Sequence, residues 1–76
     1  MWWYFIKLNE TLETILYAYG FESKNTTGQF EYDKANNKVK ILKYADNHSE
    51  NKDIQHAAYQ LVKKYGHLER KMIAYG

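Results

Sequence analysis

Three histidines and three carboxylates in the second half of the chain could bind a metal or transfer protons. They are His48, His56, His67, Asp46, Asp53 and Glu69. Asp53 and His56 are three residues apart, so they would share one side of a helix. A metal needs three or four converging ligands, and the sequence contains no His-x-x-x-His, His-Glu-x-x-His or Cys-x-x-Cys spacing. We therefore expect solvated side chains here, with no metal, no cofactor and no catalytic residue.

Motifs for nucleophilic catalysis and for phosphate binding are also missing. Ser23 and Ser49 lack the Gly-x-Ser-x-Gly context of a nucleophile. Ser49 and Asn51 are instead candidate helix caps. The loop around Gly28 has no P-loop pattern, and 76 residues leave little room for a closed ligand pocket. We expect a protein that is not an enzyme and that binds no small molecule.

The basic residues raise the alternative of a weak single-stranded nucleic-acid binder. Lys38, Lys40 and Lys43 lie in one hairpin-like segment, and lysines beside exposed aromatic rings are typical of single-strand binding. Glu31 and Asp33 in the same segment can neutralise these lysines. Of the 11 basic residues only Arg70 is an arginine, the side chain that suits phosphate and base recognition.

Helical periodicity occurs in one segment only. Apolar residues recur at the spacing of one helix face, at Ile54, Ala57, Ala58, Leu61, Val62 and Tyr65. Lys63 and Lys64 would lie in the last turn, where cations suit the helix dipole, and Gly66 would follow the helix. The sequence therefore predicts one helix that runs to about Tyr65.

The rest of the chain reads as short strands. Trp2 to Leu8 is rich in aromatic and branched residues, which favour strands. Leu12 to Phe21 fits either a strand or a helical turn; Gly20 and the aromatic residues favour a strand paired with the first one. Leu68 to Tyr75 is predicted to be the last strand.

A central hairpin is the clearest strand prediction. Asn residues between its two arms tolerate the backbone of a tight turn. A register with Tyr32 opposite Val39 also pairs Phe30 with Ile41, and it places Glu31 opposite Lys40. Apolar residues then share one face and opposite charges share the other, so the register is self-consistent.

Together these elements predict one α+β domain over residues 1–76. The order is ββββαβ: a small antiparallel sheet of four to five strands with one helix packed on one face. The predicted core contains apolar residues from each element: Ile6, Leu8, Phe30, Tyr32, Val39, Ile41, Ile54, Ala58, Leu61, Val62 and Ile73.

The first two strands are apolar on both faces, which one helix cannot cover. With Ile6 and Leu8 assigned to the core, the opposite face would be rich in aromatic residues. Four of them are the candidates for a contact: Trp3, Phe5, Tyr17 and Tyr19. We expect these residues to contact another chain, either a second copy in a homodimer or a small protein partner. The alternative is a monomer whose tyrosine hydroxyls reach solvent.

Composition restricts the remaining possibilities. The net charge is only +2, there is no cysteine, and aromatic residues make up 17% of the chain. The apolar start is too short for a signal peptide, and no window approaches the ~20 apolar residues of a membrane helix. We expect a cytoplasmic protein without membrane contact.

Three segments also carry a resemblance. They are the run from Ile41 to Asp46, the pair Ala57 and Ala58, and the ending from Arg70 to Gly76. Over the part of the chain that these segments span, about half of its length, the chain resembles small uncharacterised proteins of low-GC Gram-positive bacteria. The resemblance implies no function and assigns no role to any residue.

Overall fold

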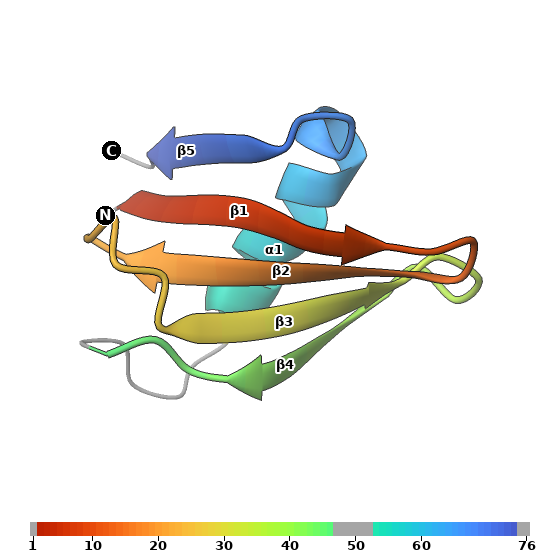
Figure 1. The fold of residues 1–76 in the computed structure, drawn as a ribbon, viewed down its shortest axis with the longest axis horizontal. Coiled ribbons are helices and arrows are strands. Elements are labelled where there is room, and N and C mark those ends of the chain that lie inside the picture. Colours follow the sequence, from red (N-terminus) through yellow and green to blue (C-terminus); the bar gives the residue numbers. More distant parts are fainter. Residues whose placement is uncertain (1, 47–52, 75–76) are drawn as a thin grey trace.

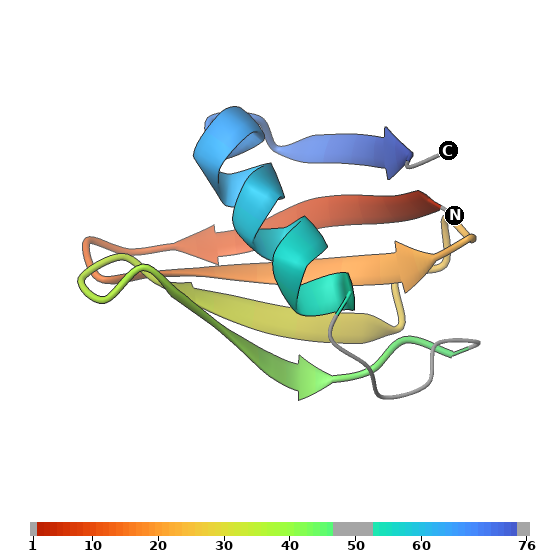
Figure 2. The same ribbon diagram turned by 180° about the vertical axis from the view of Figure 1, so that it is seen from behind.

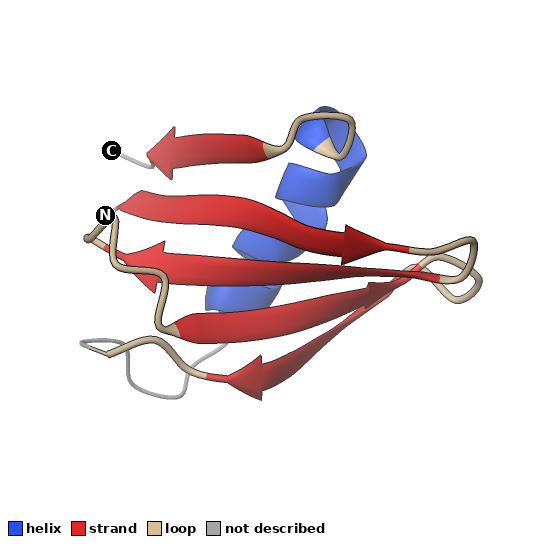
Figure 3. Ribbon diagram, in the orientation of Figure 1, coloured by secondary structure: helices blue, strands red, loops and turns tan. Residues whose placement is uncertain are grey.

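The computed structural model describes residues 2–46 and 53–74, which form one five-stranded antiparallel sheet and one helix (Figure 1; Figure 3). The elements in chain order are β1 (Trp2–Glu10), β2 (Thr14–Phe21), β3 (Gly28–Asp33), β4 (Lys38–Lys43), α1 (Asp53–Tyr65) and β5 (Arg70–Ala74). The strand order in the sheet is β4-β3-β2-β1-β5. The first four strands are therefore a meander, and β5 returns beside β1. This confirms the predicted α+β fold.

Both hairpins form as predicted. The segment from Leu12 to Phe21 contains a strand, β2, which pairs with β1 and β3. In the second hairpin Tyr32 lies opposite Val39, as the alternation of apolar residues indicated. The turn between β3 and β4 places Asn37 at a φ of 53°, a left-handed backbone that Asn tolerates better than most residues.

Helix α1 lies on one face of the sheet and crosses it obliquely from β3 toward β5 (Figure 2). Its buried side chains are the predicted ones: Ile54, Ala57, Ala58 and Leu61. Gly66 follows the helix without a left-handed φ, so it is not a glycine C-cap. Instead, Lys7 Nζ of β1 donates to the Gly66 carbonyl oxygen at 2.5 Å, which suits the negative end of the helix dipole. The cap candidates Ser49 and Asn51, and His48, lie outside the described residues.

The core fills the space between α1 and the sheet. Its centre is a cluster of rings, in which Tyr17 stacks on Phe30 with centroids 4.9 Å apart. Phe5 meets the edge of Phe30 at 5.8 Å. The strand residues buried in this core cluster are Trp3, Phe5, Ile15, Tyr17, Tyr19, Phe30, Tyr32 and Val39.

The core prediction is correct for β3, β4, α1 and β5 but wrong for β1. Ile41, Val62 and Ile73 pack against the core and are partly buried, as expected. Leu8, however, is 49% exposed, and Ile6 points away from the helix. Alternation along a strand separates two faces, but it does not say which one the helix covers.

Candidate interaction surface

The sheet face opposite α1 has no helix over it in the described part of the chain; Figure 1 looks onto this open face. Its side chains follow from the register, because Tyr4 lies opposite Gly20 and Met72, and Ile6 lies opposite Ala18 and Arg70. The apolar residues that the register places on this face form one group, which we call the apolar patch: Trp2, Tyr4, Ile6, Leu16 and Met72.

The apolar patch is centred on β1. Met72 is 53% exposed, and the other members are half-buried. Leu8, which is 49% exposed, lies at the register shift in β1. On the far side of β2 the face becomes charged, with Glu31 of β3 opposite Lys40 of β4. The surface therefore has an apolar centre beside a charged margin, as protein interfaces do.

One end of the open face is covered by the chain itself. A Cβ atom on Gly20 would lie 2.3 Å from the Ser23 carbonyl oxygen and 2.5 Å from that of Asn25. The segment after β2 thus folds back over Gly20, a close approach that only glycine permits. Glu22 in this segment has a φ of 51°, and its N–H donates to the Trp2 carbonyl oxygen at 2.9 Å. This segment limits the apolar patch at that end.

The structure places the four predicted interface residues on the other face. Trp3, Phe5, Tyr17 and Tyr19 lie under α1 and are at most 2% exposed. Their assignment to a partner surface is therefore wrong. The sequence contains two apolar faces in the first hairpin, and α1 covers the one with the larger number of aromatic rings, because rings bury more area.

The three lysines predicted for nucleic-acid binding all lie on β4. Lys38 is opposite Asp33, Lys40 is opposite Glu31, and Lys43 is opposite Gln29. Three strand spacings, roughly 14 Å, separate β4 from the rings on β1. The acidic residues of β3 lie between them, so lysines and aromatic rings do not form one continuous surface.

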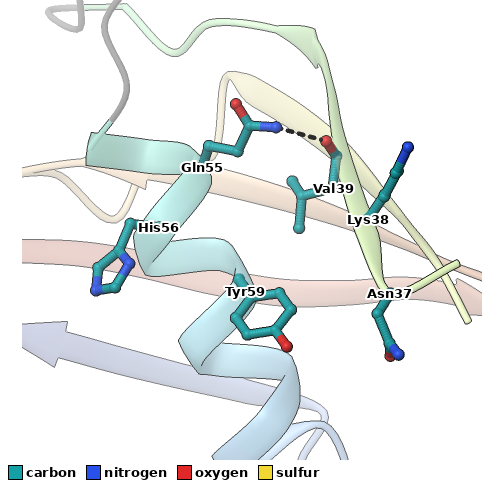
Figure 4. Close-up of a pocket in the computed structure, with 6 residues that line it drawn as sticks. All are labelled: Asn37, Lys38, Val39, Gln55, His56 and Tyr59. Carbon is teal, nitrogen blue, oxygen red and sulfur yellow. Dashed lines mark hydrogen bonds between the residues drawn. The ribbon is translucent and has the colours of Figure 1, made fainter.

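A hollow, which we call the edge groove, lies between α1 and β4 (Figure 4). It has a volume of about 500 Å³ and is lined by Asn37, Lys38, Val39, Gln55, His56 and Tyr59. Gln55 Nε2 donates to the Val39 carbonyl oxygen at 2.9 Å, which joins the helix to the outer edge of the sheet. Nothing in the sequence indicates this groove, because the polar residues outside the apolar helix stripe carry no signal of which strand they will contact.

A network of ion pairs lies at the end of the sheet that carries the β1–β2 and β3–β4 turns. The Glu10 carboxylate lies 2.8 Å from both Lys7 Nζ and Lys34 Nζ. Hydrogen bonds from Lys34 and then Lys7 lower the pKa of Glu10 to about 2. Because Lys7 also binds the Gly66 carbonyl oxygen, the network joins β1 to the end of α1 and to the β3–β4 turn.

Two buried tyrosine hydroxyls differ in their surroundings. The Tyr19 hydroxyl accepts a hydrogen bond from the Ala45 N–H at 3.0 Å. The Tyr17 hydroxyl has no hydrogen-bond partner within residues 2–46 and 53–74. Burial, with a smaller contribution from the charge of Glu10, raises the pKa of Tyr17 to about 12. Neither hydroxyl is accessible for chemistry with a ligand.

The remaining candidates from the sequence do not converge. His56 is exposed in the edge groove, and His67 is exposed beyond the end of α1. Among the described residues, no group of three His, Cys, Asp or Glu side chains could hold a metal. The helix that the structure describes is too short and too polar to cross a membrane.

Comparisons with protein-family models, with curated proteins and with solved structures find no match for this chain. The resemblance noted in the sequence stays a prediction. The function must therefore be argued from the two surfaces just described.

Proposed function

We propose that this chain is a small non-catalytic interaction module that forms a homodimer through the apolar patch. The observation that carries the proposal is the row Trp2, Tyr4 and Ile6 on the open side of β1, with Met72 and Leu16 on either side. Contiguous apolar surface on a small domain usually marks a contact with another molecule.

A second copy fits this patch for reasons of symmetry. A two-fold axis parallel to β1 stacks β1 on its partner's β1, and β2 on its partner's β5. The apolar patch then meets itself, and the charged strands β3 and β4 lie at the rim, where water still reaches them. A net charge of only +2 opposes this association weakly.

The size of the face sets the expected strength. In this arrangement the three strands β2, β1 and β5 of each copy overlap. Three strands about 4.8 Å apart, each about six residues long, give a flat area on the order of 300 Å². A stable interface buries about 800 Å² on each partner, so the contact is smaller than that of a stable dimer. We therefore expect a dimer that dissociates on dilution.

The test is molar mass in solution, measured by light scattering over a wide range of concentration. The wild-type mass should rise from the monomer value of 9.1 kDa toward twice that value. Met72→Glu puts a charge into the patch at an exposed position and should keep the chain monomeric. Leu12→Glu is the matched control, because Leu12 is 96% exposed in the β1–β2 turn, and it should behave as wild type.

Two results would contradict the proposal. One is a wild-type chain that stays monomeric at every concentration. The other is a dimer that survives Met72→Glu, which would place the contact on a different surface.

A further inference from the structure

Within residues 2–46 and 53–74, no strand pairs with the outer edge of β4. β4 is the last strand of the described sheet, and β3 is its one neighbour there. The Val39 carbonyl oxygen accepts a hydrogen bond from Gln55, so it points away from β3. In an antiparallel pair the outward N–H and C=O belong to the same residue and recur at every second position. Val39 and Ile41 therefore turn their backbone N–H and C=O groups away from β3, and Val39, whose carbonyl is bound by Gln55, is only 7% exposed.

The edge groove runs along this strand on the side of the helix. Val39 forms part of its wall on the sheet, and Gln55 and Tyr59 form part of its wall on α1 (Figure 4). The Gln55 side-chain N–H donates a hydrogen bond to the outward carbonyl oxygen of Val39. A backbone N–H of an added strand could replace it with the same kind of bond.

The edge is basic. Lys38, Lys40 and Lys43 follow one another along β4, and within the described residues none has a carboxylate within 4 Å. The Asp33 carboxylate, opposite Lys38, instead accepts hydrogen bonds from the backbone and side chain of Asn36 and from the Ala35 N–H. The Asn36 side chain, followed by smaller contributions that include the charge of Lys38, lowers the pKa of Asp33.

Other charges near the groove leave the balance positive. Lys63 of α1 reaches the β3–β4 turn, where its Nζ donates to Asn37 Oδ1 at 3.1 Å. The acidic groups on β3 and α1 are three: Glu31, opposite Lys40, Asp33, opposite Lys38, and Asp53 at the start of α1. Two copies of β4 paired edge to edge would bring lysines together, which disfavours self-pairing here.

We propose that the β4 edge and the edge groove bind an extended acidic segment of a partner protein, which adds to the sheet as a sixth strand. Main-chain hydrogen bonds to Val39 and Ile41 would supply the pairing, as in other cases of strand addition. Alternate side chains of the segment then lie on opposite sides. Those beside Val39 and Tyr59 enter the groove and should be apolar, and those beside Lys38 and Lys40 should be Asp or Glu.

This pattern defines the probe. A synthetic, end-blocked peptide of alternating glutamate and valine carries the expected alternation, and the same peptide with glutamine for glutamate is the uncharged control. Titrated into the ¹⁵N-labelled full chain, the acidic peptide should shift the amide signals of Val39 and Ile41 and slow their hydrogen exchange. The glutamine peptide should bind at least 10-fold more weakly.

A charge-matched pair of variants tests the site. Lys38→Glu with Lys40→Glu should weaken binding of the acidic peptide at least 10-fold. Lys24→Glu with Lys64→Glu changes the net charge equally at two exposed positions away from β4, and it should bind as wild type does. Met72→Glu should also leave binding unchanged, which separates this proposal from the homodimer.

Three outcomes would overturn the proposal. In the first, the peptide shifts signals of the apolar patch but not those of β4. In the second, both double variants bind equally well, so that only net charge matters. In the third, the chain binds oligothymidylate through the same lysines and does not bind the peptide, which would assign the edge to nucleic acid.

Discussion

The two faces of the sheet have similar sequences but different environments. Phe5 and Ile6 are neighbours on β1, yet Phe5 is fully buried beneath α1 and Ile6 lies on the open face. The covered face is built from interlocking rings, such as the stacked pair Tyr17 and Phe30. The open face is mainly aliphatic beyond Trp2 and Tyr4. The comparison shows that the helix covers the face with the larger area of aromatic rings, because burying that area is more favourable. The other apolar face stays uncovered, and we propose that it is used for association.

The largest expected difference between the faces is the cost of removing a side chain. Phe5→Ala should lower the free energy of unfolding by about 3–5 kcal/mol, because a buried ring is lost and a cavity remains. Ile6→Ala should cost about 1 kcal/mol in the monomer, since its side chain is already partly hydrated. Chemical denaturation measures both free-energy changes, at protein concentrations too low for the dimer to form.

The total stability of a 76-residue domain is on the order of 4–11 kcal/mol, so Phe5→Ala could prevent folding. Phe5→Leu keeps most of the volume and gives a measurable alternative, with a loss of about 1–2 kcal/mol. Equal losses at the two positions would mean that the faces are assigned wrongly.

The next effect tests the covered end of the open face. Gly20→Ala forces a methyl group against the carbonyl oxygens of Ser23 and Asn25, so the loop after β2 must move. We expect a loss of about 1–3 kcal/mol, measured as a lower thermal midpoint. Unchanged stability would show that this loop does not press against the sheet.

A smaller effect distinguishes two hydroxyls within the covered face. Tyr19→Phe removes the acceptor for the Ala45 N–H and should cost about 1 kcal/mol. Tyr17→Phe removes a buried hydroxyl without a partner among the described residues, so stability should stay the same or rise by up to about 1 kcal/mol. Denaturation of the two single variants makes the comparison, and a larger loss for Tyr17→Phe would contradict it.

The same tyrosine gives a pH dependence. The pKa of Tyr17 is raised from 10.0 to about 12, so the folded state favours its neutral form. Below pH 10 the tyrosine is neutral in both the folded and the unfolded chain and causes no pH dependence. As the pH rises from 10 toward 12, it ionises first in the unfolded chain, so the free energy of unfolding falls. Tyr17→Phe should flatten the alkaline part of the stability curve.

The smallest effect concerns Glu10, at the end of β1. Its pKa is lowered from 4.5 to about 2, so the stability from its ion pairs is present above pH 4.5 and is lost as the pH falls toward 2. Glu10 is 41% exposed, so water screening limits the effect to less than about 1 kcal/mol. Acid titration of Glu10→Gln should lack this part of the decline, and 1 M salt should reduce it in the wild type. An identical acid profile in the variant would contradict it.

Much of the fold was predictable from local patterns. Period-two alternation identified the strands, including the register of Tyr32 with Val39, because each pattern involves residues close in sequence. The helix and its buried residues followed from spacing of 3.6. For the candidate site, the sequence predicted that a single helix would leave one apolar face of the first hairpin uncovered. Its residues were predicted on the wrong side of β1 and β2.

By itself, the sequence determined which segments are strands and helix, their order, and the presence of two apolar faces in the first hairpin. The tertiary structure decided which face is open, because exchanging the faces leaves the alternation unchanged. It also decided the contacts of Gly20 with its own loop, of Gln55 with Val39, and of Lys7 with Gly66. The last two join segments distant in sequence; all three depend on how the chain crosses or folds back over the sheet, which no local pattern encodes.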